Sequence, residues 1–147
     1  MAPLFFLCYI LYIMWTCIKC GRIFKRTEQP HSCSKVPLDE HFKNKAKAKE
    51  LFDYLLKQVD KKIGKTKIIS LPCCIHLFGT YDFLAALPKR ESIEIRIGLD
   101  RVIGGPRMIQ SVPLSSKSYK NCFEISSLKE IDDEFMGWLK ESYYLKT

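Results

Sequence analysis

Residues 92–99 read SIEIRIGL, and this stretch indicates the fold class. Ile or Leu occupies every second position from 93 to 99, while Glu94 and Arg96 stand between them. An alternation with a period of two places the apolar side chains on one face of a β-strand and the charged ones on the other. Such half-buried strands are typical of antiparallel sheets, so we expect an antiparallel sheet around this strand.

Further apolar segments lie on both sides of this strand. Pro72, Gly79 and Pro88 separate those before it, and the sequence Gly104-Gly105-Pro106 predicts a loop after it. We expect an antiparallel sheet of about four to five strands, drawn from six candidate segments. The candidate strands are residues 67–71, 75–78, 81–87, 92–99, 108–112 and 121–125.

Two helices are expected to accompany the sheet. Apolar residues recur at helical spacing from about residue 38 to Ile63, and Gly64 is a suitable C-terminal stop. A final helix is expected to begin at Ser127, because Ser127 and Glu130 form a capping-box pattern. The order is a short cysteine-rich segment, a helix, antiparallel strands and a helix, which predicts the α+β class.

Before the first helix, the spacing of cysteine and histidine predicts a metal site. Cys17 and Cys20 form a C-x2-C pair, and His31 and Cys33 form an H-x-C pair ten residues later. Gly21 suits the tight turn of the first pair because it adopts positive φ easily. Four nitrogen and sulfur ligands fill a tetrahedral shell, as in structural zinc sites. We therefore predict one structural Zn²⁺ ion in a zinc knuckle.

The cysteines of this segment also fit two simpler interpretations. They could be a chance cluster, or one disulfide with a spare thiol. Trp15 and Phe24 are expected to form an apolar floor under the ion, although they could stack on bases instead. The remaining Cys8, Cys73, Cys74 and Cys122 lie in apolar runs and are expected to be small buried hydrophobes.

Residues 1–15 are almost wholly apolar but shorter than the roughly 20 residues that span a bilayer. They could form a membrane-surface anchor or a docked strand or helix, or they could precede a natural start at Met14, which we favour over Met1. The expected organisation is an apolar extension at 1–13, the zinc knuckle at 14–36 and an α+β domain at 37–147. Membrane contact is expected only if 1–13 are native and exposed.

Charge and cysteine usage narrow the class of protein. The net charge is +8, and residues 1–65 hold 13 Lys and Arg against 6 Asp and Glu. This basic half favours anionic partners, although the lysines of the first helix are also consistent with a solvated surface. The odd number of cysteines and the metal pattern favour a reducing compartment, so we expect a cytoplasmic protein.

The motifs resemble an uncharacterised bacterial family. The knuckle from Met14 to Cys33 resembles its start, and Ser115 to Tyr119 with residues 131–143 resembles its end. The family carries domain-of-unknown-function family 5655 and is broadly similar to the small α+β YdhG-like proteins. The resemblance implies the fold and the zinc, but no activity. Ile18 stands where the family usually has Pro, and a His that relatives often carry near residue 121 is absent.

No catalytic constellation is evident in the sequence. Cys74 and His76 could be a nucleophile and base, or could hold a second metal with Cys73, but neither a third orienting group nor a fourth ligand is apparent. We therefore expect a non-enzymatic zinc-containing binding module for an unidentified small molecule or protein. The predicted ligand surface lies at Arg96, Arg101, Lys117 and Tyr119. The alternative is nucleic-acid binding through the basic knuckle and the lysine-rich helix.

Overall fold

The computed structural model describes residues 15–31 and 33–145, and the chain divides into two compact units, Met1–Ser34 and Lys35–Thr147. The predicted extension at 1–13 and the predicted start at Met14 lie outside the described residues. In the first unit, strand β1 (Trp15–Thr16) pairs antiparallel with β2 (Ile23–Phe24). This short hairpin holds the cysteine-bearing turn between its strands.

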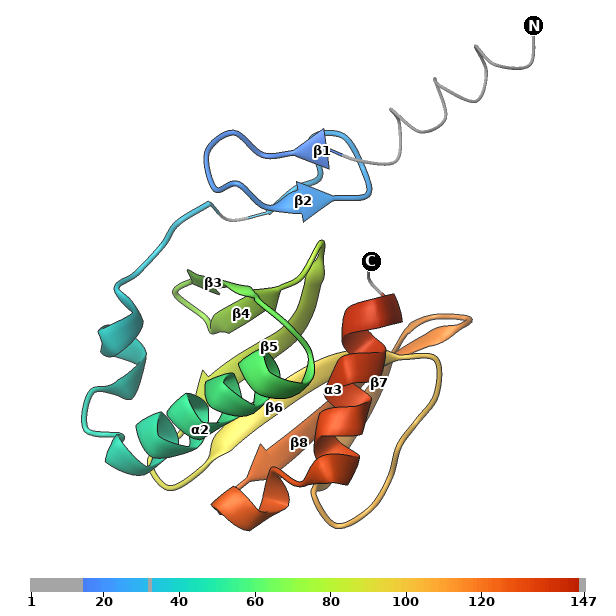
Figure 1. The fold of residues 1–147 in the computed structure, drawn as a ribbon. Coiled ribbons are helices and arrows are strands. Elements are labelled where there is room, and N and C mark those ends of the chain that lie inside the picture. Colours follow the sequence, from blue (N-terminus) through green and yellow to red (C-terminus); the bar gives the residue numbers. More distant parts are fainter. Residues whose placement is uncertain (1–14, 32, 146–147) are drawn as a thin grey trace, which may run out of the picture. The chain divides into compact units, whose positions relative to one another are not determined.

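The second unit contains a six-stranded antiparallel sheet (Figure 1). Its strand order is β3-β4-β5-β6-β8-β7, so only β7 departs from sequential order. The predicted α+β class is confirmed, with more strands than the four to five expected. The strands are β3 (Lys67–Ser70), β4 (Ile75–Phe78), β5 (Asp82–Pro88), β6 (Ile93–Leu99), β7 (Met108–Ser115) and β8 (Ser118–Ile125).

Strand β7 runs through Pro113, beyond the predicted end at residue 112. Proline lacks a backbone N–H and is excluded from central strands, but an edge strand needs hydrogen bonds on one side only. Because β7 pairs with β8 alone, it tolerates Pro113 opposite Tyr119. The edge position therefore explains why the strand is longer than its sequence indicates.

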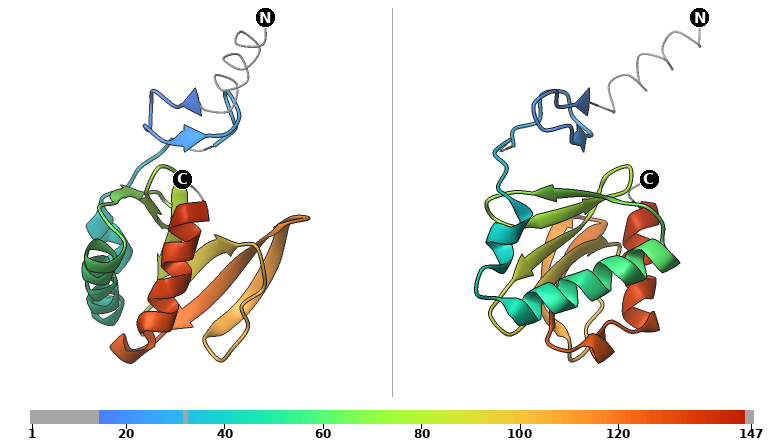
Figure 2. Two further views of the ribbon diagram at one scale, coloured as in Figure 1. Left: turned by 45° about the vertical axis from the view of Figure 1, so that its right-hand side comes forward. Right: turned by 60° about the vertical axis from the view of Figure 1, so that its left-hand side comes forward.

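Helices α2 (Ala46–Lys62) and α3 (Asp133–Leu145) lie on the same face of the sheet (Figures 1 and 2). Their apolar stripes meet the alternating side chains of the central strands, and the core includes Phe52, Ile95, Phe123 and Phe135. We call the opposite sheet face, which carries His76 and Arg96, the open face. None of the helices in the described part of the chain is both long and apolar enough to cross a membrane.

The predicted first helix is interrupted. Residues Leu38–Phe42 form the 3-10 helix η1, and α2 begins only at Ala46. Asn44 has a φ of 58°, in the left-handed region that asparagine tolerates better than most residues. Gly64 ends α2 as predicted, since its N–H donates to the carbonyl of Val59 and its φ is positive.

The predicted C-terminal helix is likewise divided. The capping box of Ser127 and Glu130 is present, but it caps the 3-10 turn η2 (Leu128–Glu130). Helix α3 has its own cap, because Asp132 Oδ1 accepts a hydrogen bond of 2.9 Å from the N–H of Phe135. This hydrogen bond and the guanidinium of Arg107 lower the pKa of Asp132.

Asn121 fastens the loop after β6 to the sheet. Its side chain is fully buried, accepts from the N–H of Ile103 at 3.1 Å and donates to the carbonyl of Arg101 at 3.0 Å. We expect Asn121→Ala to lower the free energy of unfolding by about 1–3 kcal/mol, because two backbone groups lose their partner. Urea unfolding measures this loss.

Ser111 provides the matched control for this substitution. It lies directly opposite Asn121 on β7, and its buried hydroxyl has no partner among the described residues. Ser111→Ala should therefore cost no stability, because it removes a buried hydroxyl that makes no hydrogen bond. Equal losses for the two variants would contradict the assigned role of Asn121.

Candidate functional site

The structure brings Cys17, Cys20, His31 and Cys33 together in a group that could hold a metal ion. All four ligand atoms lie within 4.8 Å of one another. The Cys17 and Cys33 sulfurs are 3.6 Å apart, and His31 Nε2 lies 3.4 Å from Cys20 Sγ and 3.2 Å from Cys33 Sγ. With Zn–S bonds of about 2.3 Å and Zn–N bonds of about 2.0 Å, tetrahedral edges measure about 3.5–3.8 Å. The observed separations approach those edges.

The turn that carries Cys17 and Cys20 is held by a positive φ at Gly21 and by backbone hydrogen bonds. Gly21 has a φ of 74°, as predicted, and its N–H donates to the carbonyl of Cys17 at 2.8 Å. The N–H of Cys17 donates to the carbonyl of Arg22 at 2.9 Å. These two hydrogen bonds close the turn, so the C-x2-C pair is held in place by the local backbone.

The imidazole of His31 is oriented for metal binding. Its Nδ1–H donates to the carbonyl of Gln29 at 2.6 Å, so in the neutral ring Nε2 is the unprotonated atom, and it faces the thiols. The ring packs at 4.3 Å from the ring of Phe24, and Trp15 lies 5.8 Å away. Both aromatic side chains therefore support the histidine, as expected for an apolar floor.

The surroundings of the thiols favour negative charge at the turn. Backbone hydrogen bonding, chiefly from the N–H of Cys20, lowers the pKa of Cys17 to about 6. Burial raises the pKa of Cys20, but hydrogen bonding with Arg22 more than offsets it, and the net shift is downward. Burial raises the pKa of Cys33, whose proton a bound cation would displace.

The four residues of the predicted ligand surface do not share one face. Arg96 is on the open face of β6, whereas Tyr119 lies opposite Leu99, whose side chain belongs to the core on the helix side. Lys117 is in the turn between β7 and β8. The structure therefore separates these residues instead of gathering them.

Both arginines of the predicted ligand surface, Arg96 and Arg101, form ion pairs within the domain. Arg101 makes a bidentate pair with Glu141 on α3, with a distance of 3.0 Å between Nη2 and Oε2. Arg96 Nε donates to Glu94 Oε2 at 2.5 Å on its own strand. Arg96 also lines a pocket.

The pocket beside Arg96 has a volume of about 240 Å³ and lies on the open face. His76, Ala85 and Arg96 are consecutive cross-strand partners on β4, β5 and β6. Neighbouring strands are about 4.8 Å apart, and the methyl group of Ala85 is too small to fill the space between its larger neighbours. The small side chain on the central strand thus accounts for the hollow.

His76 has two polar partners in this pocket. Its Nε2 lies 3.0 Å from Cys74 Sγ, and its Nδ1 contacts Asp82 Oδ2. The sequence showed no third group that would orient the Cys74–His76 pair. In the structure, Asp82 is that group. Cys74 is buried and burial raises its pKa to about 12, while Cys73 is exposed, contrary to its prediction as a buried hydrophobe.

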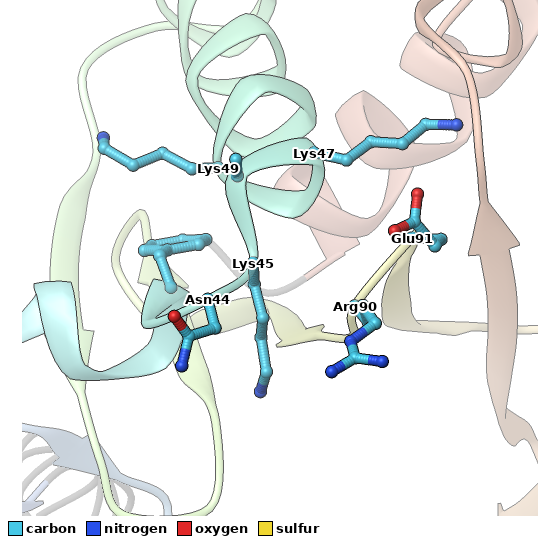
Figure 3. Close-up of a pocket in the computed structure, with 8 residues that line it drawn as sticks. Asn44, Lys45, Lys47, Lys49, Arg90 and Glu91 are labelled. Atoms are coloured by element: carbon cyan, nitrogen blue, oxygen red, sulfur yellow. The ribbon is translucent and has the colours of Figure 1, made fainter.

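A basic cleft of about 930 Å³ lies at the start of α2. Lys45 and Arg90 extend in the same direction, whereas Lys47 and Lys49 point to opposite sides (Figure 3). Lys45 Nζ donates to the carbonyl of Pro88 at 3.1 Å. Lys47 and Lys49 therefore diverge from Lys45 and Arg90, and the four cationic groups do not converge on one anion.

Comparison with known proteins identifies the α+β unit. Residues 38–146 match the family described as Domain of unknown function (DUF5655). The chain belongs to the DUF5655 family. The match begins with η1 and includes the whole six-stranded sheet, so we refer to the second unit as the DUF5655 domain. The knuckle precedes the matched residues. No curated protein and no solved structure matches the chain.

Proposed function

We propose that this protein is a small zinc-containing binding module without enzymatic activity. In this proposal Cys17, Cys20, His31 and Cys33 hold one structural Zn²⁺ ion, and the DUF5655 domain presents the surface for a small ligand or protein. The observation that carries the proposal is the convergence of four ligand atoms within 4.8 Å around a hydrogen-bonded turn. Four protein ligands leave no open position, which is typical of a structural ion.

The choice of zinc rests on the donor set. Three thiols and an imidazole nitrogen suit Zn²⁺, whereas Mg²⁺ and Ca²⁺ take oxygen ligands. Three thiolates and the ion carry a net charge of −1, and Arg22 and Lys19 are next to the ligands in sequence to offset it. A cation in this position would replace the thiol protons and tie the two ends of the segment together.

Amide NMR on the full chain tests the knuckle. We expect the resonances of residues 15–34 in reduced, metal-free protein to be poorly dispersed, and to become dispersed and sharp at one equivalent of Zn²⁺. The reason is that so short a segment has too small a core to fold without the ion. A spectrum of this segment that does not respond to Zn²⁺ would argue against the proposal.

The proposed ligand surface of the DUF5655 domain centres on the pocket beside Arg96. The pocket is concave, lies on the open face of the sheet and combines the apolar side chains of Ala85 and Leu114 with charged groups. Chemical-shift mapping against a metabolite library tests this placement. Perturbations that avoid Arg96 and its neighbours for every bound compound would remove the pocket from the proposal.

Nucleic-acid binding is the second candidate, and the basic cleft at α2 is the observation that favours it. If the cleft contacts phosphates, the affinity for single-stranded oligothymidylate should fall steeply with salt. Replacing Lys47 and Arg90 together by alanine should reduce the slope of log K against log salt concentration by about 1.4, or about 0.7 per contact. Fluorescence anisotropy at several salt concentrations provides the measurement.

Lys117→Ala is the matched control, because Lys117 does not line the cleft. It should leave the slope unchanged if binding uses the cleft. Binding that is weak and nearly independent of salt would eliminate this candidate, and the diverging lysine side chains favour that outcome.

A further inference from the structure

We propose that Cys73, Cys74 and His76 form a second metal site, which binds a zinc-class divalent cation through three protein ligands and leaves the fourth position open. The ligand atoms of these residues lie within 4.8 Å of one another. This site is in the DUF5655 domain, does not share residues with the knuckle and does not depend on the proposed function.

The partners of His76 are those of a metal ligand. Its Nε2 faces Cys74 Sγ at 3.0 Å, while the carboxylate of Asp82 holds Nδ1 from the next strand. Histidines that bind metals generally donate their second ring N–H to a carboxylate or carbonyl, which fixes the tautomer and the ring orientation. Asp82 therefore positions the imidazole instead of binding the ion itself.

The second thiol distinguishes a metal site from a catalytic Cys–His–Asp arrangement. Cys73 Sγ lies 2.8 Å from Cys74 Sγ, close enough to share one ion with it. A nucleophilic mechanism needs one accessible thiol, but Cys74 is only 6% exposed and the adjacent Cys73 would have no role. In a tetrahedral site the sulfurs would stand about 3.8 Å apart, which the exposed side chain of Cys73 can reach by rotation.

The three ligands of this site determine its net charge and the kind of ion that it would bind. Two thiolates neutralise a divalent cation, and a neutral imidazole completes three ligands that suit zinc. Cys74, His76 and Asp82 line the pocket of about 240 Å³ described above, but Cys73 does not. An ion held by these ligands would therefore have the pocket on one side, where water or a small donor molecule could occupy the fourth position.

Native mass spectrometry of the reduced full chain with added Zn²⁺ tests the site. We expect two ions per chain for the wild type and one for His76→Ala. Asp82→Asn should bind the second ion about 10–100-fold more weakly, because it loses the orienting carboxylate. Cys122→Ala is the matched control, since it removes a buried thiol outside both clusters, and it should retain two ions.

The knuckle is tested separately by the double substitution Cys17→Ser/Cys20→Ser, which should remove the other ion. If the double variant loses an ion but His76→Ala does not, the second site is overturned while the knuckle site stands. A Cys73–Cys74 disulfide in place of the ion, with no metal uptake after reduction, would overturn it as well. In the double variant loaded with Co²⁺, added azide should change the visible absorption bands, and unchanged bands would contradict an open fourth position.

Discussion

Replacing Cys20 by serine is expected to unfold the knuckle while the DUF5655 domain stays folded. Cys20 is buried and its sulfur faces His31, so the substitution removes one of the four proposed metal ligands from the centre of a unit with no other large core among its described residues. Structural zinc supplies on the order of 10 kcal/mol to comparable peptides. Trypsin cleavage after Lys19, Arg22 and Lys25 should therefore accelerate by about 100-fold or more, as followed by intact-mass spectrometry.

The thermal transition of the DUF5655 domain serves as the internal reference in this experiment. It should be unchanged in Cys20→Ser, because residues 35–147 form a compact unit of their own. Cys122→Ala, a substitution of a buried thiol in that domain, should leave knuckle cleavage at the wild-type rate. Equal cleavage rates for Cys20→Ser and the wild type would show that the cluster does not stabilise the knuckle.

Phe123→Ala is expected to destabilise the DUF5655 domain by about 3–5 kcal/mol, a large part of the 5–15 kcal/mol typical of a domain. Phe123 is fully buried at the point where β8 meets α3. Its ring stacks on Trp138 at 5.4 Å and meets Phe135 edge-to-face at 5.6 Å. Truncation removes both contacts and leaves a cavity beneath the helix, and urea unfolding measures the loss.

Ile109→Ala is the matched control on the neighbouring edge strand. Its side chain is 49% exposed and lies outside the core. We expect it to cost less than about 1 kcal/mol, because little apolar area returns to water. A similar loss for the two variants would mean that the interface of β8 with α3 does not dominate the stability of the domain.

The parts of the structure that depend on local spacing were predictable from the sequence. The positive φ of Gly21 followed from the C-x2-C turn, and the residues of the cysteine–histidine cluster followed from two short motifs. The alternation in 92–99 placed strand β6, which is observed at Ile93–Leu99. In these cases the residues that determine the structure are neighbours in the sequence.

Features that depend on the register between paired strands were not predictable in the same way. Asp82 meets His76 only because β4 and β5 pair across a bulge, and the sequence gives no sign of that register. The separation of Arg96 from Tyr119 likewise follows from the pairing of β6 with β8. The break at Asn44 was missed because the apolar period continues through it, although the left-handed tolerance of asparagine was a usable signal.

The proposed zinc ion at Cys17, Cys20, His31 and Cys33 can be tested directly. The measurement is native mass spectrometry combined with elemental zinc analysis, on freshly purified wild type and on Cys17→Ser/Cys20→Ser. We expect the wild type to carry one more zinc ion per chain than the double variant, and a chelator to remove this ion. The same zinc content in both proteins would contradict the proposed site.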